Sequence, residues 1–251
     1  MFQRNPKQRE ILRDKKVCIV GCGSIGSALA DMLVRSGVEH FTLIDSDEFS
    51  QENLARHVLT PRALDKNKAD ALSHHLMSVN PSVYVNVCPS KVEDARITPL
   101  DIFISCVDSY RAESYVNQLA LNLGVPAVFV GCWGAARTGE IFVARGKPCY
   151  ECYASFRAKE DIPVDPKKYT DPKFDETKIP GQEGLWANIL IISGIAFKII
   201  YEVLSLPANT ESPLFLFNID GSDFKPLTGH SVPVNRGCAV CDPAKVAELT
   251  I

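Results

Sequence analysis

A six-residue glycine loop, Gly21-Cys22-Gly23-Ser24-Ile25-Gly26, constrains this chain more than any other feature. It follows the apolar run "VCIV" and precedes an apolar helical pattern. Glycine at the first position permits a tight turn, at the third it lets an anion approach the backbone, and at the sixth it lets helix and strand pack closely. The loop therefore predicts a strand–turn–helix unit whose helix N–H groups and dipole point at a phosphate.

The first half of the chain alternates between strand and helix periods, which predicts a parallel sheet covered on both faces. Short β-branched runs lie at 17–21, 41–45, 83–87, 102–106 and 128–131, and helical patterns lie near 25–36, 64–78 and 111–123. In the second half, "GEIFVAR" and "PLFLFNID" are typical of strands, and a long helix is expected near 186–204. The fold class is therefore α/β, a Rossmann-like and mostly parallel sheet with an antiparallel C-terminal extension.

Composition narrows the class of protein. The formal net charge is -3 and the pI is near 6.0, which argues against a nucleic-acid partner because such proteins usually carry a basic stripe. The apolar segment 185–204 is interrupted by Asn188, Lys198 and Glu202, so we expect a buried or subunit-interface helix rather than a membrane span. Nine cysteines without an export signal favour a reducing compartment, and we expect a cytoplasmic protein.

The segment 155–184 is polar and highly charged, and it contains four prolines without hydrophobic periodicity. It is too long for an ordinary connection between two elements. We therefore expect it to be a mobile functional loop within one domain that spans residues 1–251.

Charged and polar side chains follow the predicted second and fourth strands. Asp45 ends the second strand nineteen residues after Gly26, where a carboxylate commonly binds ribose hydroxyls. Arg56 and Lys68 could clamp a triphosphate, with Asn53 beside them, and Asp108 could hold Mg²⁺. Because the carboxyl ends of parallel strands share one edge of the sheet, these groups should converge there.

Each of these residues also has a simpler interpretation. Arg56 or Lys68 alone could be a solvated surface charge. Asp47 and Glu48 could cap the turn that follows them, and Asp108 could be the N-cap of the helix after it. The conjunction of all these residues favours a nucleotide site, and we include Ser24 and Asp47 among its predicted members.

Two Cys-x-x-Cys pairs, Cys149/Cys152 and Cys238/Cys241, predict a tetrahedral Cys₄ zinc site. Four thiolates fill the coordination sphere, so the metal would be structural; a redox pair or free thiols are the alternatives. Cys132 follows a parallel strand, where chemistry would occur, but no partner base is evident for a nucleophilic role. The histidines are scattered and are expected mostly on the surface.

Together these motifs resemble the ThiF/MoeB family of adenylyltransferases, which are related to ubiquitin-activating enzymes. "VCIVGCGSIGSALADMLVRSGVEHFTLIDSDEFSQENLARH", "DIFISCVDS", "GEIFVARGKPCYECY" and "RGCAVC" occur in family order over most of the chain. The resemblance implies an ATP- and Mg²⁺-dependent enzyme with structural Zn²⁺ that adenylates the C-terminal carboxylate of a ubiquitin-like or sulfur-carrier protein ending in Gly-Gly. The loop Gly21–Gly26 would surround ATP, Asp45 would bind its ribose, Asn53, Arg56 and Lys68 its phosphates, and Asp108 the Mg²⁺. Residues 155–184 would be the crossover loop, and a homodimer is expected.

Three departures from the family pattern matter. Ser24 replaces a common glycine, and the upstream arginine of the family has no secure match, with Arg4 and Arg9 as candidates. No cysteine lies between Cys152 and Cys238, so we expect the chain to form no thioester on its own crossover loop. Two alternatives stay open: a non-catalytic or partner-dependent half of a heterodimeric activating enzyme, and an NAD-dependent oxidoreductase with a structural zinc.

Overall fold

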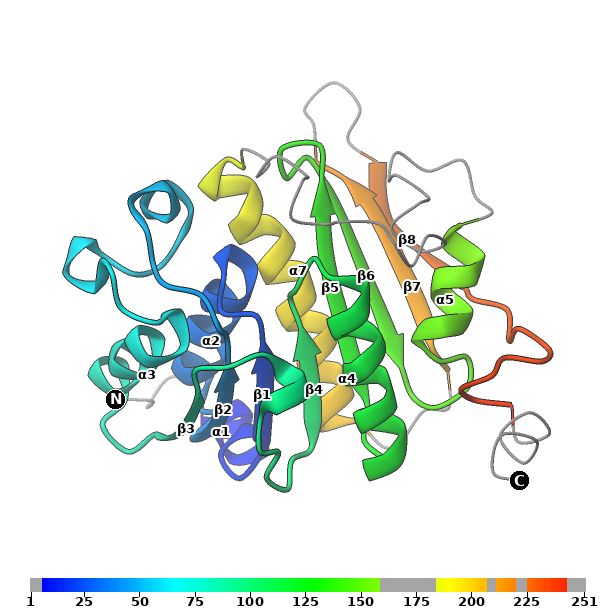
Figure 1. Ribbon diagram of the computed structural model, residues 1–251, viewed down its shortest axis with the longest axis horizontal. Coiled ribbons are helices and arrows are strands. Elements are labelled where there is room, and N and C mark those ends of the chain that lie inside the picture. Colours follow the sequence, from blue (N-terminus) through cyan, green and yellow to red (C-terminus); the bar gives the residue numbers. More distant parts are fainter. Residues whose placement is uncertain (1–5, 159–183, 207–210, 220–224, 243–251) are drawn as a thin grey trace.

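The computed structural model describes residues 6–158, 184–206, 211–219 and 225–242, and it forms one eight-stranded sheet flanked by helices (Figure 1). The strands are β1 (Lys16–Val20), β2 (His40–Ile44), β3 (Tyr84–Cys88), β4 (Ile102–Ser105), β5 (Ala127–Trp133), β6 (Thr138–Ala144), β7 (Pro213–Asn218) and β8 (Lys225–Ser231). The helices are α1 (Pro6–Leu12), α2 (Ser24–Ser36), α3 (Lys68–Val79), α4 (Tyr110–Leu123), α5 (Tyr150–Arg157) and α7 (Trp186–Ser205), with 3₁₀ turns η1 (Gln51–Arg56), η2 (Pro61–Ala63) and η3 (Val92–Asp94).

The strand order β3-β2-β1-β4-β5-β6-β7-β8 confirms the predicted fold class. The first five strands in this order are parallel, and β6, β7 and β8 extend the sheet in antiparallel fashion. The order reverses direction at β1, which lies between β2 and β4. Val20 at the end of β1 is in register with Ile44 and Ser105, so the chain leaves three adjacent strands at one level. We call this the carboxyl edge of the sheet.

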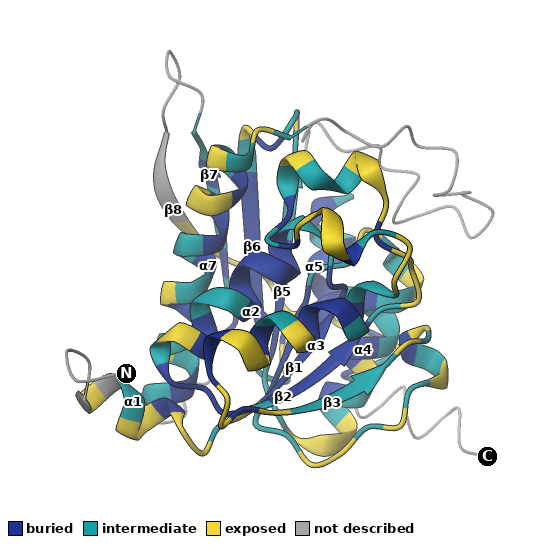
Figure 2. Ribbon diagram, turned by 90° about the vertical axis from the view of Figure 1, so that its left-hand side faces the viewer, coloured by how far each residue is buried: buried dark blue, intermediate teal, exposed yellow. Residues whose placement is uncertain are grey.

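Alternation of side chains along the strands divides the core into two layers. Figure 2 shows that the strands in the middle of the sheet are mostly buried between the helices. Val17 and Ile19 face the layer that contains α2, α3 and α7, whereas Cys18 and Val20 face the layer that contains α4 and α5. Because both faces of the inner parallel strands β1 and β4 are buried, these strands are apolar at nearly every position, whereas the edge strand β3 is partly exposed. The apolar runs of the first half thus follow from burial on two sides.

Helix α7 is long and apolar enough, by length and composition alone, to cross a membrane. In the described structure it packs against α2 and also contacts α1 and β5. Its residues Ile192, Ala196 and Ile200 are fully buried in the core. Helix α7 therefore covers one face of the sheet, in agreement with the buried helix predicted from the polar residues that interrupt its apolar sequence.

The structure differs from the sequence-based boundaries in three places. The helix expected near 64–78 begins at Lys68, because the Asn67 side chain accepts a hydrogen bond from the Asp70 N–H (3.1 Å) and residues 61–63 form η2 instead. Helices α1 and α5 and strand β8 had no prediction. Helix α5 continues through Arg157, so the first residues of the predicted loop 155–184 are helical; residues 159–183 lie outside the described residues.

Candidate functional site

The glycine loop lies between β1 and α2 at the carboxyl edge of the sheet. Gly21 has φ +89°, and a Cβ atom there would lie 2.8 Å from the Cys106 carbonyl oxygen. A Cβ atom on Gly26 would lie 1.9 Å from the Gly21 carbonyl oxygen, whereas one on Gly23 would meet nothing within 4 Å. Gly21 and Gly26 therefore permit close backbone packing. Gly23 leaves open space before the N-terminus of α2, and a helix N-terminus favours anions.

Asp45 connects the loop to the segment after β2. Its carboxylate accepts hydrogen bonds from the backbone N–H groups of Cys22 (2.7 Å) and Asp47 (2.8 Å). The Asn67 side chain donates to the carbonyl oxygens of Asp45 (2.9 Å) and Asp47 (3.2 Å). Burial raises the pKa of Asp45, and these backbone N–H donors and Lys68 oppose that rise. Sequence reasoning missed Asn67, although its position before a helical pattern is a cap signal.

The two predicted cations lie at the same edge. The Lys68 ammonium pairs with the Asp47 carboxylate at 2.8 Å, and the Lys68 side chain is only 12% exposed. The Arg56 guanidinium lies 3.5 Å from the Ser24 hydroxyl of the glycine loop. Neither cation is a freely solvated surface charge, and both are placed where a phosphate chain at the loop would meet positive charge.

The turn η1, which carries Asn53 and Arg56, is capped by Ser50 and not by Asp47 or Glu48. The Asn53 side-chain oxygen accepts hydrogen bonds from the Ser50 N–H (3.0 Å) and hydroxyl (3.2 Å) in a capping box. The interpretation of Asp47 and Glu48 as caps is therefore wrong. Asn53 in turn serves the local geometry of η1 in this structure.

Asp108 follows β4 at the carboxyl edge and is exposed. Its backbone neighbours Cys106 and Val107 lie against Gly21. The N-cap of α4 is Ser109, whose hydroxyl accepts a hydrogen bond from the Ala112 N–H. The interpretation of Asp108 as an N-cap is therefore wrong, and Asp108 directly follows the two residues that lie against the glycine loop.

His57 is a buried member of this site that sequence reasoning missed, and the expectation of a surface histidine is wrong there. Its Nε2 lies 2.8 Å from the Cys22 carbonyl oxygen, and its Nδ1 accepts a hydrogen bond from the Leu59 N–H at 3.1 Å. Nδ1 accepts, so Nε2 carries the proton and donates to the glycine loop. Burial lowers the pKa of His57 to about 4, so the ring is neutral at pH 7.

Cys132, at the end of β5, is half-buried. Burial raises the pKa of its thiol, and nearby Arg56 only partly offsets this effect. A thiol with a raised pKa is a poor nucleophile. In the described part of the chain, the net effect on the Cys132 thiol therefore opposes its activation as a nucleophile.

Arg9, a candidate for the upstream arginine, lies far from this edge. Its guanidinium pairs with Glu39 at 2.9 Å, where Arg13 also contacts Glu39. Glu39 immediately precedes β2, so this cluster lies at the opposite, amino edge of the sheet. Arg4 lies outside the described residues.

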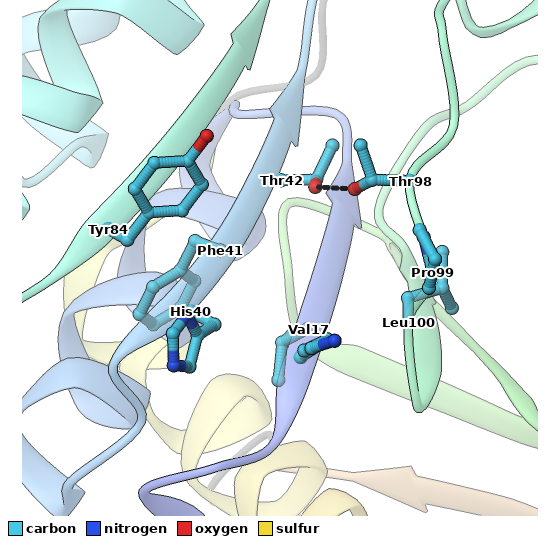
Figure 3. A pocket seen from close by; sticks show the side chains of 9 residues that line it. Val17, His40, Phe41, Thr42, Tyr84, Thr98, Pro99 and Leu100 are labelled. Carbon is cyan, nitrogen blue, oxygen red and sulfur yellow. Dashed lines mark hydrogen bonds between the residues drawn. The ribbon is translucent and has the colours of Figure 1, made fainter.

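Two hollows flank the sheet at different ends. A pocket of about 150 Å³ lies at the amino edge, lined by the starts of β1, β2 and β3 and by Thr98, Pro99 and Leu100 (Figure 3). An open hollow of about 430 Å³ lies between the β5–β6 turn and the start of α7, where Ala135, Arg137 and Asn188 line it. The pocket of about 150 Å³ lies at the amino edge, and the charged residues described above lie at the carboxyl edge.

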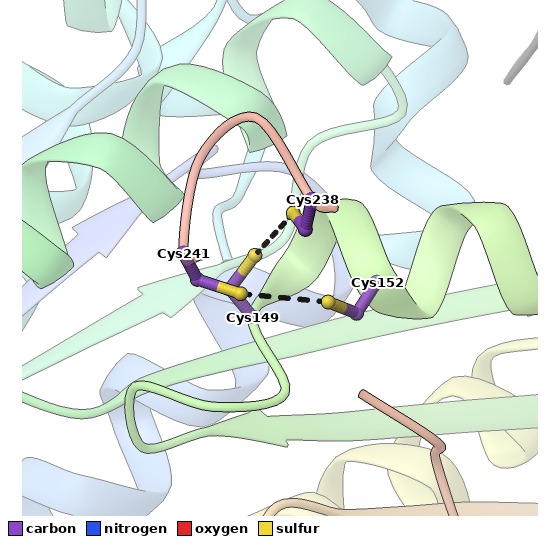
Figure 4. A group of neighbouring side chains, drawn as sticks. All are labelled: Cys149, Cys152, Cys238 and Cys241. Carbon is purple, nitrogen blue, oxygen red and sulfur yellow. Dashed lines mark hydrogen bonds between the residues drawn. The ribbon is translucent and has the colours of Figure 1, made fainter. Parts of the chain in front are cut away.

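The four paired cysteines meet in one cluster, as predicted (Figure 4). Their Sγ atoms all lie within 4.8 Å of one another, and the Cys149–Cys238 and Cys152–Cys241 sulfur pairs lie 3.8 and 3.5 Å apart. A Zn²⁺ ion with bonds of about 2.3 Å to four sulfurs needs a sulfur–sulfur spacing of about 3.8 Å. The Asn235 N–H also donates to Cys152 Sγ at 3.4 Å. The donor set and its spacing fit zinc.

The sheet is mostly parallel, with the glycine loop at its reversal point and charged residues at the same edge. Together with a four-cysteine cluster that fits a metal ion, this architecture defines a Rossmann-like α/β protein. Residues 3–240 match the model of the ThiF family, and the chain belongs to this family.

Its relatives include ubiquitin-like modifier-activating enzyme 5 of Oryza sativa subsp. japonica, which is 30% identical over 78% of this chain and 51% of the relative. The same enzyme of Drosophila mojavensis is 27% identical over 79% of this chain and 54% of the relative. The chain thus spans about half the length of these relatives. E. coli MccB, crystallised with ATP, superposes with a TM-score of 0.72 at 18% identity, covering 93% of this chain and 68% of MccB. At that identity the likeness shows the shared fold.

Proposed function

We propose that this chain binds ATP and transfers its adenylyl group to the C-terminal carboxylate of a ubiquitin-like or sulfur-carrier protein. The observation that carries the proposal is the convergence of the glycine loop, Asp45, Arg56, Lys68 and Asp108 at one edge of the sheet. Membership of the ThiF family supports it, as do relatives named as ubiquitin-like modifier-activating enzymes. An oxidoreductase would leave the two cations and Asp108 without a role.

The roles of the residues follow from their chemistry. Gly21, Gly23, Ser24 and Gly26 surround the nucleotide, and Asp45 and Asp47 face its ribose side. Asn53, Arg56 and Lys68 bind phosphate oxygens, and Asp108 would hold Mg²⁺, which would supply positive charge beside the phosphates.

In the reaction, a carboxylate oxygen of the carrier attacks the α-phosphorus, and the bond to the pyrophosphate oxygen breaks. The products are an acyl-adenylate and pyrophosphate. The residues of the chain contribute by holding the reactants in line and by stabilising developing negative charge, and no side chain takes a proton.

The partner would be a carrier protein that ends in Gly-Gly, and the active form would be a cytoplasmic homodimer with zinc as a structural ion. No cysteine lies between Cys152 and Cys238, so the acyl group would pass to an external thiol or amine. Mass spectrometry of the chain incubated with ATP and its carrier should find no thioester adduct; a carrier linked through a thioester to this chain would contradict this part.

ATP–pyrophosphate exchange against a panel of Gly-Gly carriers tests the main proposal. Exchange should require a carrier, and Asp108→Ala should reduce it by roughly 100-fold or more, the usual cost of removing one electrostatic contact of a transition state. Asp14→Ala, an exposed carboxylate at the amino edge, is the matched control and should retain exchange. Tight NAD binding without exchange would overturn the proposal, and exchange only after addition of a second subunit would favour the partner-dependent alternative.

A further inference from the structure

Helix α4 carries a stripe of polar side chains on the face that meets α5. The stripe consists of Tyr110, Glu113, Ser114 and Asn117, which recur at the helical spacing i, i+3, i+4, i+7. Glu113 is 7% exposed and Asn117 is 1% exposed. Helix faces that pack inside a protein are normally apolar, and buried polar groups must find partners. The hydrogen-bond partners of this stripe therefore identify the part of the protein to which α4 is held.

All four members of the stripe bond to the two residues that lie between the metal-site cysteines Cys149 and Cys152. The Glu151 carboxylate accepts hydrogen bonds from the Tyr110 and Ser114 hydroxyls, each at 2.5 Å. The Tyr150 hydroxyl donates to the Glu113 carboxylate, and the Tyr150 N–H donates to the Asn117 side-chain oxygen at 2.9 Å. The Cys-x-x-Cys turn is thus bonded to α4 through both of its central residues.

The first turn of α4, which carries Tyr110, directly follows a residue of the candidate active site. Tyr110 begins α4, Ser109 caps it, and Asp108 immediately precedes the cap. Burial, together with the Glu151 carboxylate, raises the pKa of Tyr110, so the phenol stays protonated and donates. Hydrogen bonds to a carboxylate are shorter and stronger than neutral ones and fix both partners.

We propose that Glu151 is a positioning residue: its carboxylate joins the Cys₄ centre to the first turn of α4 and thereby holds Asp108 beside the glycine loop. Metal ligation would restrain the turn Cys149–Cys152, that turn restrains Glu151, and Glu151 restrains Tyr110 and Ser114. The four-cysteine centre would then order the active site as well as tie the end of the chain to its body. The role of Asp108 in this inference rests on the proposed function, whereas the link between the two helices does not.

Hydrogen–deuterium exchange of peptides covering residues 109–117 tests the link directly on the zinc-loaded chain. In Glu151→Ala, with zinc content still one per chain, exchange there should accelerate at least about tenfold because two charge-assisted hydrogen bonds are lost. Tyr110→Phe combined with Ser114→Ala should reproduce the effect without altering the metal site. Gln118→Ala, exposed on the same helix, should leave exchange unchanged. Unchanged exchange in both test variants would overturn the link.

Kinetics then tests the consequence for Asp108. Glu151→Ala should lower kcat for ATP–pyrophosphate exchange about tenfold while KM for ATP stays within about twofold, and Glu151→Gln, which retains one acceptor oxygen, should recover part of the loss. A drop in thermal stability with unchanged kcat would overturn the positioning role and leave the adenylation proposal intact. If the wild-type chain showed no exchange activity at all, the proposed function would fail, and deuterium exchange would still decide whether Glu151 orders α4.

Discussion

Replacing His57 with glutamine should make the chain more resistant to mild acid. In the folded state His57 is neutral, because burial lowers its pKa to about 4 from 6.5. Protonation would also place a second ring N–H against the Leu59 N–H, which now donates to Nδ1 at 3.1 Å. The unfolded chain takes up a proton near pH 6.5, whereas the folded chain does not until about pH 4.

The sign and size of the effect follow from this difference in pKa. Between pH 6.5 and 4 the unfolded state binds more protons, so stability falls as the pH falls. The loss is about 2 kcal/mol at pH 5 and about 3 kcal/mol at pH 4 and below. At about pH 7.5, one unit above the unfolded pKa of 6.5, neither state is appreciably protonated at this residue and the contribution is essentially fully present.

Urea unfolding of the wild type and of His57→Gln at several pH values between 7.5 and 4.5 measures this loss. Glutamine keeps an amide donor for the Cys22 carbonyl oxygen but takes up no proton. Carboxylates such as Asp45, whose pKa burial raises, are common to both proteins and cancel in the difference. The stability difference between the two proteins should therefore shift by about 2 kcal/mol in favour of the variant from pH 7.5 to pH 5. Parallel stability curves would refute the assignment of a neutral, buried His57.

Three further predictions concern packing, metal and charge. Gly26→Ala should cost about 2–3 kcal/mol of stability because its Cβ would lie 1.9 Å from a carbonyl oxygen. Gly23→Ala, whose Cβ would meet nothing within 4 Å, should unfold like the wild type but bind ATP more weakly. Equal urea midpoints for the two variants would contradict this prediction. Metal analysis should find one zinc per chain. Cys238→Ser or a chelator should remove the zinc and lower the melting temperature. An unchanged melting temperature after zinc loss would argue against a structural ion. Arg157→Met should cost about 3–5 kcal/mol in urea unfolding, since it leaves the Glu140 carboxylate, 2% exposed, without its buried cation; a loss below about 1 kcal/mol would show that Glu140 is neutral or otherwise compensated.

Local sequence patterns predicted most of the sheet and of the candidate site. The apolar runs and the glycine spacing are recognisable within short segments, and strands buried on both faces show this in their own composition. The two Cys-x-x-Cys pairs likewise predicted the cluster of Cys149, Cys152, Cys238 and Cys241, because the spacing within each pair already suits one metal ion.

Other features depend on partners distant in the chain, and no local pattern contains them. Helix α5 is only eight residues long, and it is anchored through Arg157 to Glu140 of β6. The sequence suggested the acidic residues Asp47, Glu48 and Asp108 as caps, and only the backbone geometry showed that Ser50 caps η1 and Ser109 caps α4.

The sequence by itself determined that this chain forms a mostly parallel α/β sheet with a glycine loop and a four-cysteine centre, since periodicity, glycine placement and ligand spacing are properties of short segments. Only the tertiary structure decided that His57 supports the glycine loop, that Asp47 holds Lys68, and that the polar stripe of α4 bonds to Tyr150 and Glu151. The physical reason is that a polar or ionisable side chain is expected at the solvent-exposed surface unless its hydrogen-bond or ion-pair partner is known. Burial and hydrogen bonding, which the fold supplies, give each of these residues its role.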